Sequence, residues 1–91
     1  MEILQKTEFK KSYKKLHQNQ RAIVNAEIKK IIENPKIGTE KVGDLQGIFV
    51  YKFDVFDQQF LIAYTFDEKT MMLIMLGVHE NFYRKIKKIL N

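Results

Sequence analysis

Three runs of β-branched and aromatic residues in the second half of the chain constrain its fold more than any other feature. They are IFVYKFDV (48–55), QFLIAYTF (59–66) and TMMLIMLGV (70–78), and only FDQ and DEK separate them. Apolar runs of this length are typical of strands, and very short turns join strands that are antiparallel neighbours. The second half is therefore predicted to be a three-stranded antiparallel meander.

Two charged residues of the first run, Lys52 and Asp54, are predicted to point to the same face of this sheet. Side chains alternate between the two faces of a strand, so residues two apart share a face. The faces are predicted to carry Phe49, Tyr51, Phe53 and Val55 on one side, and Ile48, Val50, Lys52 and Asp54 on the other.

The first half has the pattern of one strand and two helices. MEILQ (1–5) is apolar enough for a strand, and Phe9, Tyr13 and Leu16 repeat at helical spacing within 7–16. A second helix is predicted from a cap at Asn19 to a stop near Asn34, because the residue before a proline is pushed out of helical geometry. The two helices are so closely joined that they are predicted to form an antiparallel hairpin.

The remaining segments are a loop and a terminal helix. Residues 34–47 hold the only proline and three of the four glycines, which predicts a loop of turns. The tail has an apolar stripe of Phe82, Ile86, Ile89 and Leu90, with His79 at its start. The predicted fold class is α+β, in which an N-terminal strand, a helical hairpin, a three-stranded meander and a C-terminal helix pack on one sheet.

Length and composition predict one small domain, residues 1–91, located in the cytoplasm. The longest uncharged apolar run is residues 71–78, too short to cross a membrane, and the N-terminus lacks a hydrophobic signal core. There is no cysteine, which fits a reducing compartment. The net charge is +5, with lysines concentrated near both ends and acidic residues in 43–68. Two basic ends indicate an acidic partner or nucleic acid, although lysines also commonly just solvate helix faces.

The common catalytic motifs are missing from the sequence. It has no glycine-rich phosphate loop, no HExxH, no GxSxG and no cysteine nucleophile, and its two histidines exclude a three-histidine metal site. No metal and no other cofactor is expected. The remaining cations, imidazoles, tyrosines and carboxylates suit metal-independent cleavage of a phosphodiester, which needs a base, an acid and charge stabilisation. They equally suit a protein that only binds.

Three segments, in this order and spacing, resemble the RelE/ParE superfamily of toxins from bacterial type II toxin–antitoxin systems. They are DLQGIFVYKF, QFLIAYTFDEKTMMLIMLG and HENFYRKIKKIL. The resemblance covers nearly the whole chain. It implies the RelE-like fold and an intracellular toxin that a cognate antitoxin, expected to be acidic, holds inactive. Members of the RelE branch enter the ribosome and cut mRNA, whereas ParE members inhibit DNA gyrase and lack the catalytic residues of the RelE branch.

The resemblance also assigns roles to individual positions. Lys52 matches the basic residue of the first meander strand, and His79 and Tyr83 match a C-terminal pair found in histidine-using members. The chain departs from the pattern at Asp54, where many ribosome-dependent members have a second basic residue, and at Leu61, where they have an arginine.

Each candidate has a functional and a structural interpretation. His79 suits proton exchange because the pKa of imidazole lies near neutrality, or it merely begins a helix. Tyr83 would hold a base or ribose, or be a boundary tyrosine. Lys52 would stabilise the negative charge of a phosphate, or it would only form an ion pair with Asp54 or another carboxylate. Asp54 would orient an imidazole, or it would only pair with Lys52. Cations expected to bind substrate or RNA are Lys41, Arg84 and Lys85, whereas His17 is expected to complement the dipole of the first helix.

The sequence therefore predicts a type II toxin that acts as a ribosome-dependent mRNA endonuclease. The proposed catalytic residues are His79, Lys52, Tyr83, Arg84 and Asp54, and the expected partners are an antitoxin, the ribosome and mRNA, with no membrane. Two alternatives stay open: a ParE-like gyrase inhibitor without catalytic activity, and a non-enzymatic basic module that binds nucleic acid.

Overall fold

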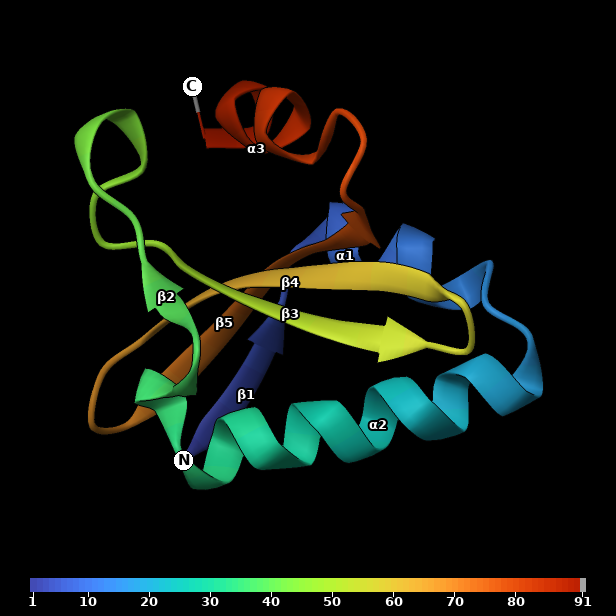
Figure 1. Ribbon diagram of the computed structural model, residues 1–91. Helices are drawn as coiled ribbons and strands as arrows, with labels where there is room; N and C mark the ends of the chain where they lie inside the picture. The colour runs from blue at the N-terminus through green and yellow to red at the C-terminus, as the bar shows by residue number, and fades with distance from the viewer. Residues whose placement is uncertain (91) are drawn as a thin grey trace.

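The computed structural model describes residues 1–90, so Asn91, the last residue of the predicted domain, lies outside it. The chain forms one five-stranded sheet with helices on both faces (Figure 1), which confirms the predicted α+β class. The elements, in chain order, are β1 (Glu2–Gln5), α1 (Thr7–Lys14), α2 (Gln18–Glu33), β2 (Thr39–Glu40), β3 (Phe49–Val55), β4 (Gln58–Phe66), β5 (Thr70–Val78) and α3 (Phe82–Leu90).

The predicted meander is confirmed, because β3, β4 and β5 are antiparallel neighbours. The sheet order is β1-β5-β4-β3-β2, with β1 parallel to β5 and β2 antiparallel to β3. Strand β2 and two 3₁₀ turns (Pro35–Ile37 and Gly43–Leu45) lie in the segment predicted to be a loop of turns only. A strand of two residues is too short to show an alternating pattern in the sequence. It is recognised only from its pairing with β3.

The two faces of the sheet carry separate apolar cores. One core joins α1 and α2 to the sheet through Phe9, Val24 and Ile31. The other joins α3 to the opposite face through Phe82 and Ile86, both fully buried. Residues 48–55 divide between the two cores as predicted: Phe49, Tyr51, Phe53 and Val55 face α1 and α2, and Ile48 and Val50 face α3.

A β-bulge in β5 interrupts this alternation. Ala63 of β4 pairs with Met75, and the next residue, Tyr64, pairs with Leu73, so Ile74 is an extra residue. Ile74 and Met75 consequently both belong to the core beneath α3. A bulge bends and twists the strand that carries it, and here it turns two successive apolar side chains toward the terminal helix.

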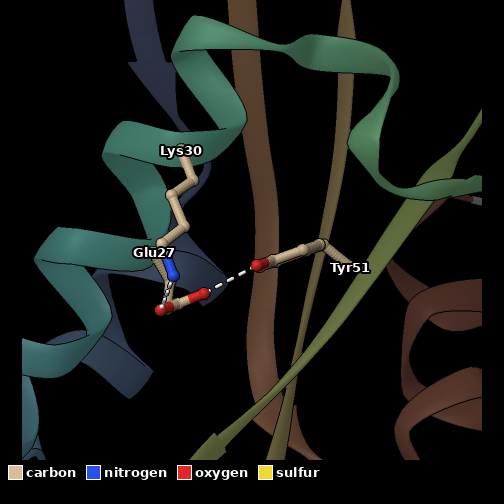
Figure 2. A network of polar contacts seen from close by, with 3 residues as sticks. All are labelled: Glu27, Lys30 and Tyr51. Atoms are coloured by element: carbon tan, nitrogen blue, oxygen red, sulfur yellow. Dashed lines mark hydrogen bonds and ion pairs between the residues drawn. The ribbon is translucent and has the colours of Figure 1, made fainter.

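Helix α2 is tied to the sheet by a polar network (Figure 2). The hydroxyl of Tyr51 donates to Oε1 of Glu27 at 2.6 Å, and Lys30 Nζ lies 2.9 Å from Oε2 of the same carboxylate. Burial raises the pKa of Tyr51 to about 12, and its hydrogen bond to Glu27 acts in the same direction. The network holds α2 against the middle of β3.

Three local predictions about helix ends are wrong. Helix α1 ends at Lys14, before Leu16, and α2 begins at Gln18, before the predicted cap Asn19. His17 is the N-cap of α2, and its backbone N–H donates to Oε1 of Gln20 at 2.7 Å. It therefore belongs to the start of the second helix, where a side chain three residues on satisfies a free backbone donor, and not to the dipole of the first.

Candidate functional site

His79 lies in the turn between β5 and α3, just after the last residue of the strand. The helix begins later than His79, at Phe82, whose N–H donates to the His79 carbonyl at 3.2 Å. Asn81 takes a left-handed conformation with φ of 63°, which asparagine tolerates better than most residues. The turn leaves the imidazole exposed. His79 is therefore free to meet a ligand and carries no part of the helical core.

Tyr83 brings His79 together with a cation from a distant loop. The ring of Tyr83 is half-buried and meets the imidazole edge-on, with ring centroids 6.1 Å apart. Lys41 Nζ lies 5.2 Å from the centroid of the same ring, within the range of a cation–π interaction. The structure thus gathers three candidate residues, His79, Tyr83 and Lys41, into one cluster.

The loop that carries Lys41 is held against α3 by a second contact. Asp44 Oδ2 lies 3.4 Å from Lys87 Nζ, and the Lys41 N–H donates to the Ile48 carbonyl at 2.8 Å. Two glycines with positive φ, Gly43 at 72° and Gly47 at 89°, allow the chain to turn between these contacts. Sequence reasoning missed the pair of Asp44 and Lys87, because no periodic pattern relates a loop residue to a distant helix.

Lys52 and Asp54 are exposed on the face of the sheet that α3 covers, as predicted. Lys52 pairs across the sheet with Leu61, and Leu61 with Gly77, two residues before His79. Two strand spacings of about 4.8 Å separate Lys52 from Gly77, so the backbones of Lys52 and His79 lie at least about 10 Å apart. They are close enough to contact one extended ligand but not each other.

The structural alternatives for this strand are not observed within residues 1–90. Lys52 forms no ion pair there, either with Asp54 or with another carboxylate. Asp54 pairs across the sheet with Gln59 and forms no hydrogen bond with His79 among those residues. The side chains of Lys52 and Asp54 are therefore available to a ligand. For Asp54 to orient the imidazole, as the sequence predicts, Asp54 or His79 has to move.

Leu61 occupies the centre of this row and is fully buried in the core beneath α3. It stands where the resemblance leads one to expect an arginine. A buried apolar side chain holds the terminal helix against the sheet but offers no charge to a phosphate. The cations proposed for the site are Lys41, which contacts the ring of Tyr83, and the exposed Lys52 and Arg84.

Lys85 does not belong to this cluster. It lines a groove of about 660 Å³ between α1 and α3, together with Lys11, Lys15 and Lys88. His79, Tyr83, Lys41 and Lys52 do not line that groove. The structure therefore separates two basic surfaces that the sequence pattern of the tail presents as one.

The cluster supplies an imidazole, an aromatic ring and nearby cations. Such a set can exchange a proton, stack on an unpaired base and balance phosphate charge. Within residues 1–90, no group of three or more histidine, cysteine or acidic side chains is placed to hold a metal ion. Across the same residues, none of the helices has the length and apolar character needed to cross a membrane.

A family model described as "ParE-like toxin of type II bacterial toxin-antitoxin system" matches residues 3–87. No curated protein sequence matches the chain.

Solved structures with the same fold include toxins of such systems. A mutant of the E. coli toxin RelE in the free state has a TM-score of 0.75 and 19% identity, covering 99% of this chain and 97% of that one. The intact E. coli RelBE toxin–antitoxin complex contributes a chain with a TM-score of 0.68 and 20% identity, covering 87% of this chain and 96% of that one. A YoeB/ParE toxin from Agrobacterium tumefaciens has a TM-score of 0.68 and 14% identity, with coverage of 87% and 99%. At these identities, the likeness establishes the fold alone.

Proposed function

The chain belongs to the ParE-like toxins of type II bacterial toxin–antitoxin systems, and we propose that it acts as a ribosome-dependent mRNA endonuclease. The observation that carries the proposal is the cluster of His79, Tyr83 and Lys41 at the edge of α3, with Lys52 on the same face of the sheet. An exposed imidazole beside an aromatic ring and a cation suits proton transfer on a bound RNA strand.

In the proposed reaction, a ribose 2′-hydroxyl attacks the adjacent phosphate of the mRNA. The new bond joins the 2′-oxygen to phosphorus, and the bond from phosphorus to the 5′-oxygen of the next nucleotide breaks. His79 takes the proton from the 2′-hydroxyl and, as the imidazolium, gives a proton to the leaving 5′-oxygen, because imidazole can accept and release a proton near neutral pH. The products are a 2′,3′-cyclic phosphate and a free 5′-hydroxyl. Lys52 and Arg84 balance the negative charge that builds on the phosphate.

Tyr83 is proposed to hold the substrate through its ring, as aromatic side chains do with unpaired bases. Lys41 Nζ lies over that ring, 5.2 Å from its centroid, and is expected to contact a phosphate. Lys85, in the separate groove, is proposed to contact RNA only if the strand extends around α3. The site is open and sparse, which suits a substrate that the ribosome positions.

The second candidate function is inhibition of gyrase without catalysis, and one observation favours it. Leu61 is fully buried beneath α3 at the place where an arginine would meet a scissile phosphate. A site without that cation has less stabilisation for the transition state, whereas a binding surface loses nothing by it.

The two candidates are separated by expressing the protein and mapping the 5′ ends of cellular mRNA. The nuclease proposal predicts new ends within translated codons, and poor cutting of naked RNA by the purified protein. Intact mRNA together with gyrase-dependent DNA breaks would favour the second candidate.

An acidic antitoxin is the proposed partner, since the E. coli protein of the same fold is found in a toxin–antitoxin complex and this chain carries a net charge of +5. Attraction between opposite charges speeds association and is screened by salt. The association rate with the antitoxin should therefore fall as ionic strength rises, and a rate that salt leaves unchanged would remove electrostatic steering from the proposal.

A further inference from the structure

Half of one sheet edge has no strand beside it. Strand β1 pairs with β5 only from Thr70 to Leu73, and the last bond on this side runs from the Lys6 N–H to the Leu73 carbonyl at 2.9 Å. The chain then leaves the sheet to form α1. Residues Ile74–Val78 pair with β4 on their other side, so within residues 1–90 their outer edge has no strand beside it. Such an edge presents backbone donors and acceptors that can pair with another strand.

The groove of about 660 Å³ lies along this open edge. Its floor includes Met75–Val78 of β5, with the buried side chains of Leu16 and Phe60 beside them. One wall is made by Glu8, Lys11 and Ser12 of α1 and by Lys15, the residue that follows the helix. The opposite wall is a face of α3, made by Lys85, Lys88 and Ile89, with Glu80 at its start.

The walls belong to opposite faces of the sheet, because α1 packs on one core and α3 on the other. Each wall carries two exposed lysines, against two glutamates in all. They are Lys11 and Lys15 in and just after α1, and Lys85 and Lys88 on α3. A strand added to β5 sends its side chains alternately to the two faces. Its odd and even positions would therefore meet different lysine pairs, which favours acidic residues at both.

The other edge of the sheet lacks this combination. Strand β2 covers only Phe49 and Val50 of β3, so the rest of that strand also has an open edge within residues 1–90. The exposed charges there, however, are Lys52 and Asp54 in alternation, followed by Asp57. An acidic strand would meet repulsion at that edge and attraction at the edge of β5.

We propose that the antitoxin inserts an extended acidic segment into this groove and adds it as a sixth strand beside Ile74–Val78. The inference rests on the proposed partner but not on the nuclease activity. Backbone pairing supplies affinity in such strand addition, and the flanking side chains supply selectivity. The segment would be acidic on both of its faces, which distinguishes it from an ordinary amphipathic edge strand with one apolar face.

The test uses the full chain labelled with ¹⁵N and a synthetic peptide of about eight residues, enough to cover the open edge at about 3.3 Å per residue. The peptide carries glutamates at odd and even positions among valines. A matched peptide has the same sequence with alternate backbone nitrogens methylated, which blocks strand pairing. The groove variant is Lys11→Glu/Lys15→Glu. The matched control is Lys10→Glu/Lys14→Glu, which reverses two neighbouring charges of α1 that lie outside the groove.

The proposal predicts that amide shifts and slowed hydrogen exchange concentrate in Ile74–Val78. The groove variant should lose at least about tenfold in affinity for the peptide, and the control variant less than about threefold. At physiological salt, charges in contact with the peptide are screened less than charges further away. The methylated peptide should bind at least about tenfold more weakly than the unmethylated one, because it cannot form the backbone hydrogen bonds that supply affinity in strand addition. Equal losses in the two variants, equal binding of the two peptides, shifts centred on β3, or no binding would each overturn it. RNA cleavage is measured separately, so an inactive but peptide-binding protein would refute the nuclease and leave this inference standing.

Discussion

The hydroxyl of Tyr51 donates a 2.6 Å hydrogen bond to Oε1 of Glu27 and so joins the middle of β3 to helix α2. Glu27 is half-buried and also paired with Lys30. Burial acts to raise the pKa of Glu27, but the hydrogen bonds from Tyr51 and Lys30 outweigh it and hold the pKa below its ordinary value. The bond is therefore one between a neutral phenol and a carboxylate over the whole neutral range.

Tyr51→Phe should lower the free energy of unfolding by about 1.5–3 kcal/mol at pH 7, the usual worth of a hydrogen bond to a charged group. The ring and its packing stay, and only the hydroxyl is lost. Urea denaturation followed by circular dichroism measures the change. Tyr13→Phe is the matched control, because the hydroxyl of Tyr13 donates to the neutral amide of Asn25 in an exposed contact. A loss in Tyr51→Phe no larger than that of the control would contradict the account.

The same variant should also change how stability depends on pH. The pKa of Tyr51 is raised from 10.0 to about 12 in the folded protein. A raised pKa adds stability that is fully present below the unfolded value and is lost as the pH rises from about 10 through 12. The lowered pKa of Glu27 adds stability that is present at neutral pH and is lost on acidification through its folded value. The difference in unfolding free energy between wild type and Tyr51→Phe should thus be largest at pH values above the pKa of Glu27 and below about 10. A difference independent of pH would show that the bond between Tyr51 and Glu27 does not depend on their protonation.

Ile86→Ala should destabilise the protein by about 2–5 kcal/mol, because Ile86 is fully buried in the core between α3 and the sheet. That is a large part of the stability of a small domain. Lys88→Ala, on an exposed position of the same helix, should change stability by less than about 0.5 kcal/mol. Similar melting temperatures for the two variants would mean that α3 is not docked as described.

Phe56→Asn should stabilise the protein by about 1 kcal/mol. Phe56 lies at the tip of the β3–β4 hairpin with φ of 56°, a left-handed conformation that costs most side chains about 1–2 kcal/mol and asparagine less. Its ring is 60% exposed, so little burial is lost. Phe56→Leu keeps an apolar side chain without the tolerance for positive φ and should bring no gain. Equal or opposite effects in thermal unfolding would show that the turn is not strained.

Strong local periodicity made much of the fold predictable. The alternation from Phe49 to Val55 identified both faces of β3, and the spacing of Phe82 and Ile86 identified the buried side of α3. Leu90, which continues that apolar stripe in the sequence, is exposed because it lies in the last turn, beyond the sheet that covers Ile86. The parallel position of β1, the strand β2 and the bulge at Ile74 depend on pairing between distant segments, which leaves no local pattern.

The candidate site was predictable to the same extent. His79 and Tyr83 are four residues apart, and their rings do meet. Lys41 joins them only because the loop from Lys41 to Ile48 folds back against α3, a tertiary contact that spacing cannot reveal. Lys85 is two residues from Tyr83, which places it on the far side of the helix and in the other groove.

The central claim, that His79 transfers protons in mRNA cleavage, is tested most directly by mapping the 5′ ends of mRNA in cells that express His79→Gln. Glutamine keeps a polar side chain but does not titrate, and His79 is exposed and outside the core, so the melting temperature should stay that of the wild type. We expect cuts within translated codons for the wild type and about 10²–10⁴-fold fewer for the variant. A His79→Gln protein that folds normally and cuts mRNA as fast as the wild type would contradict it.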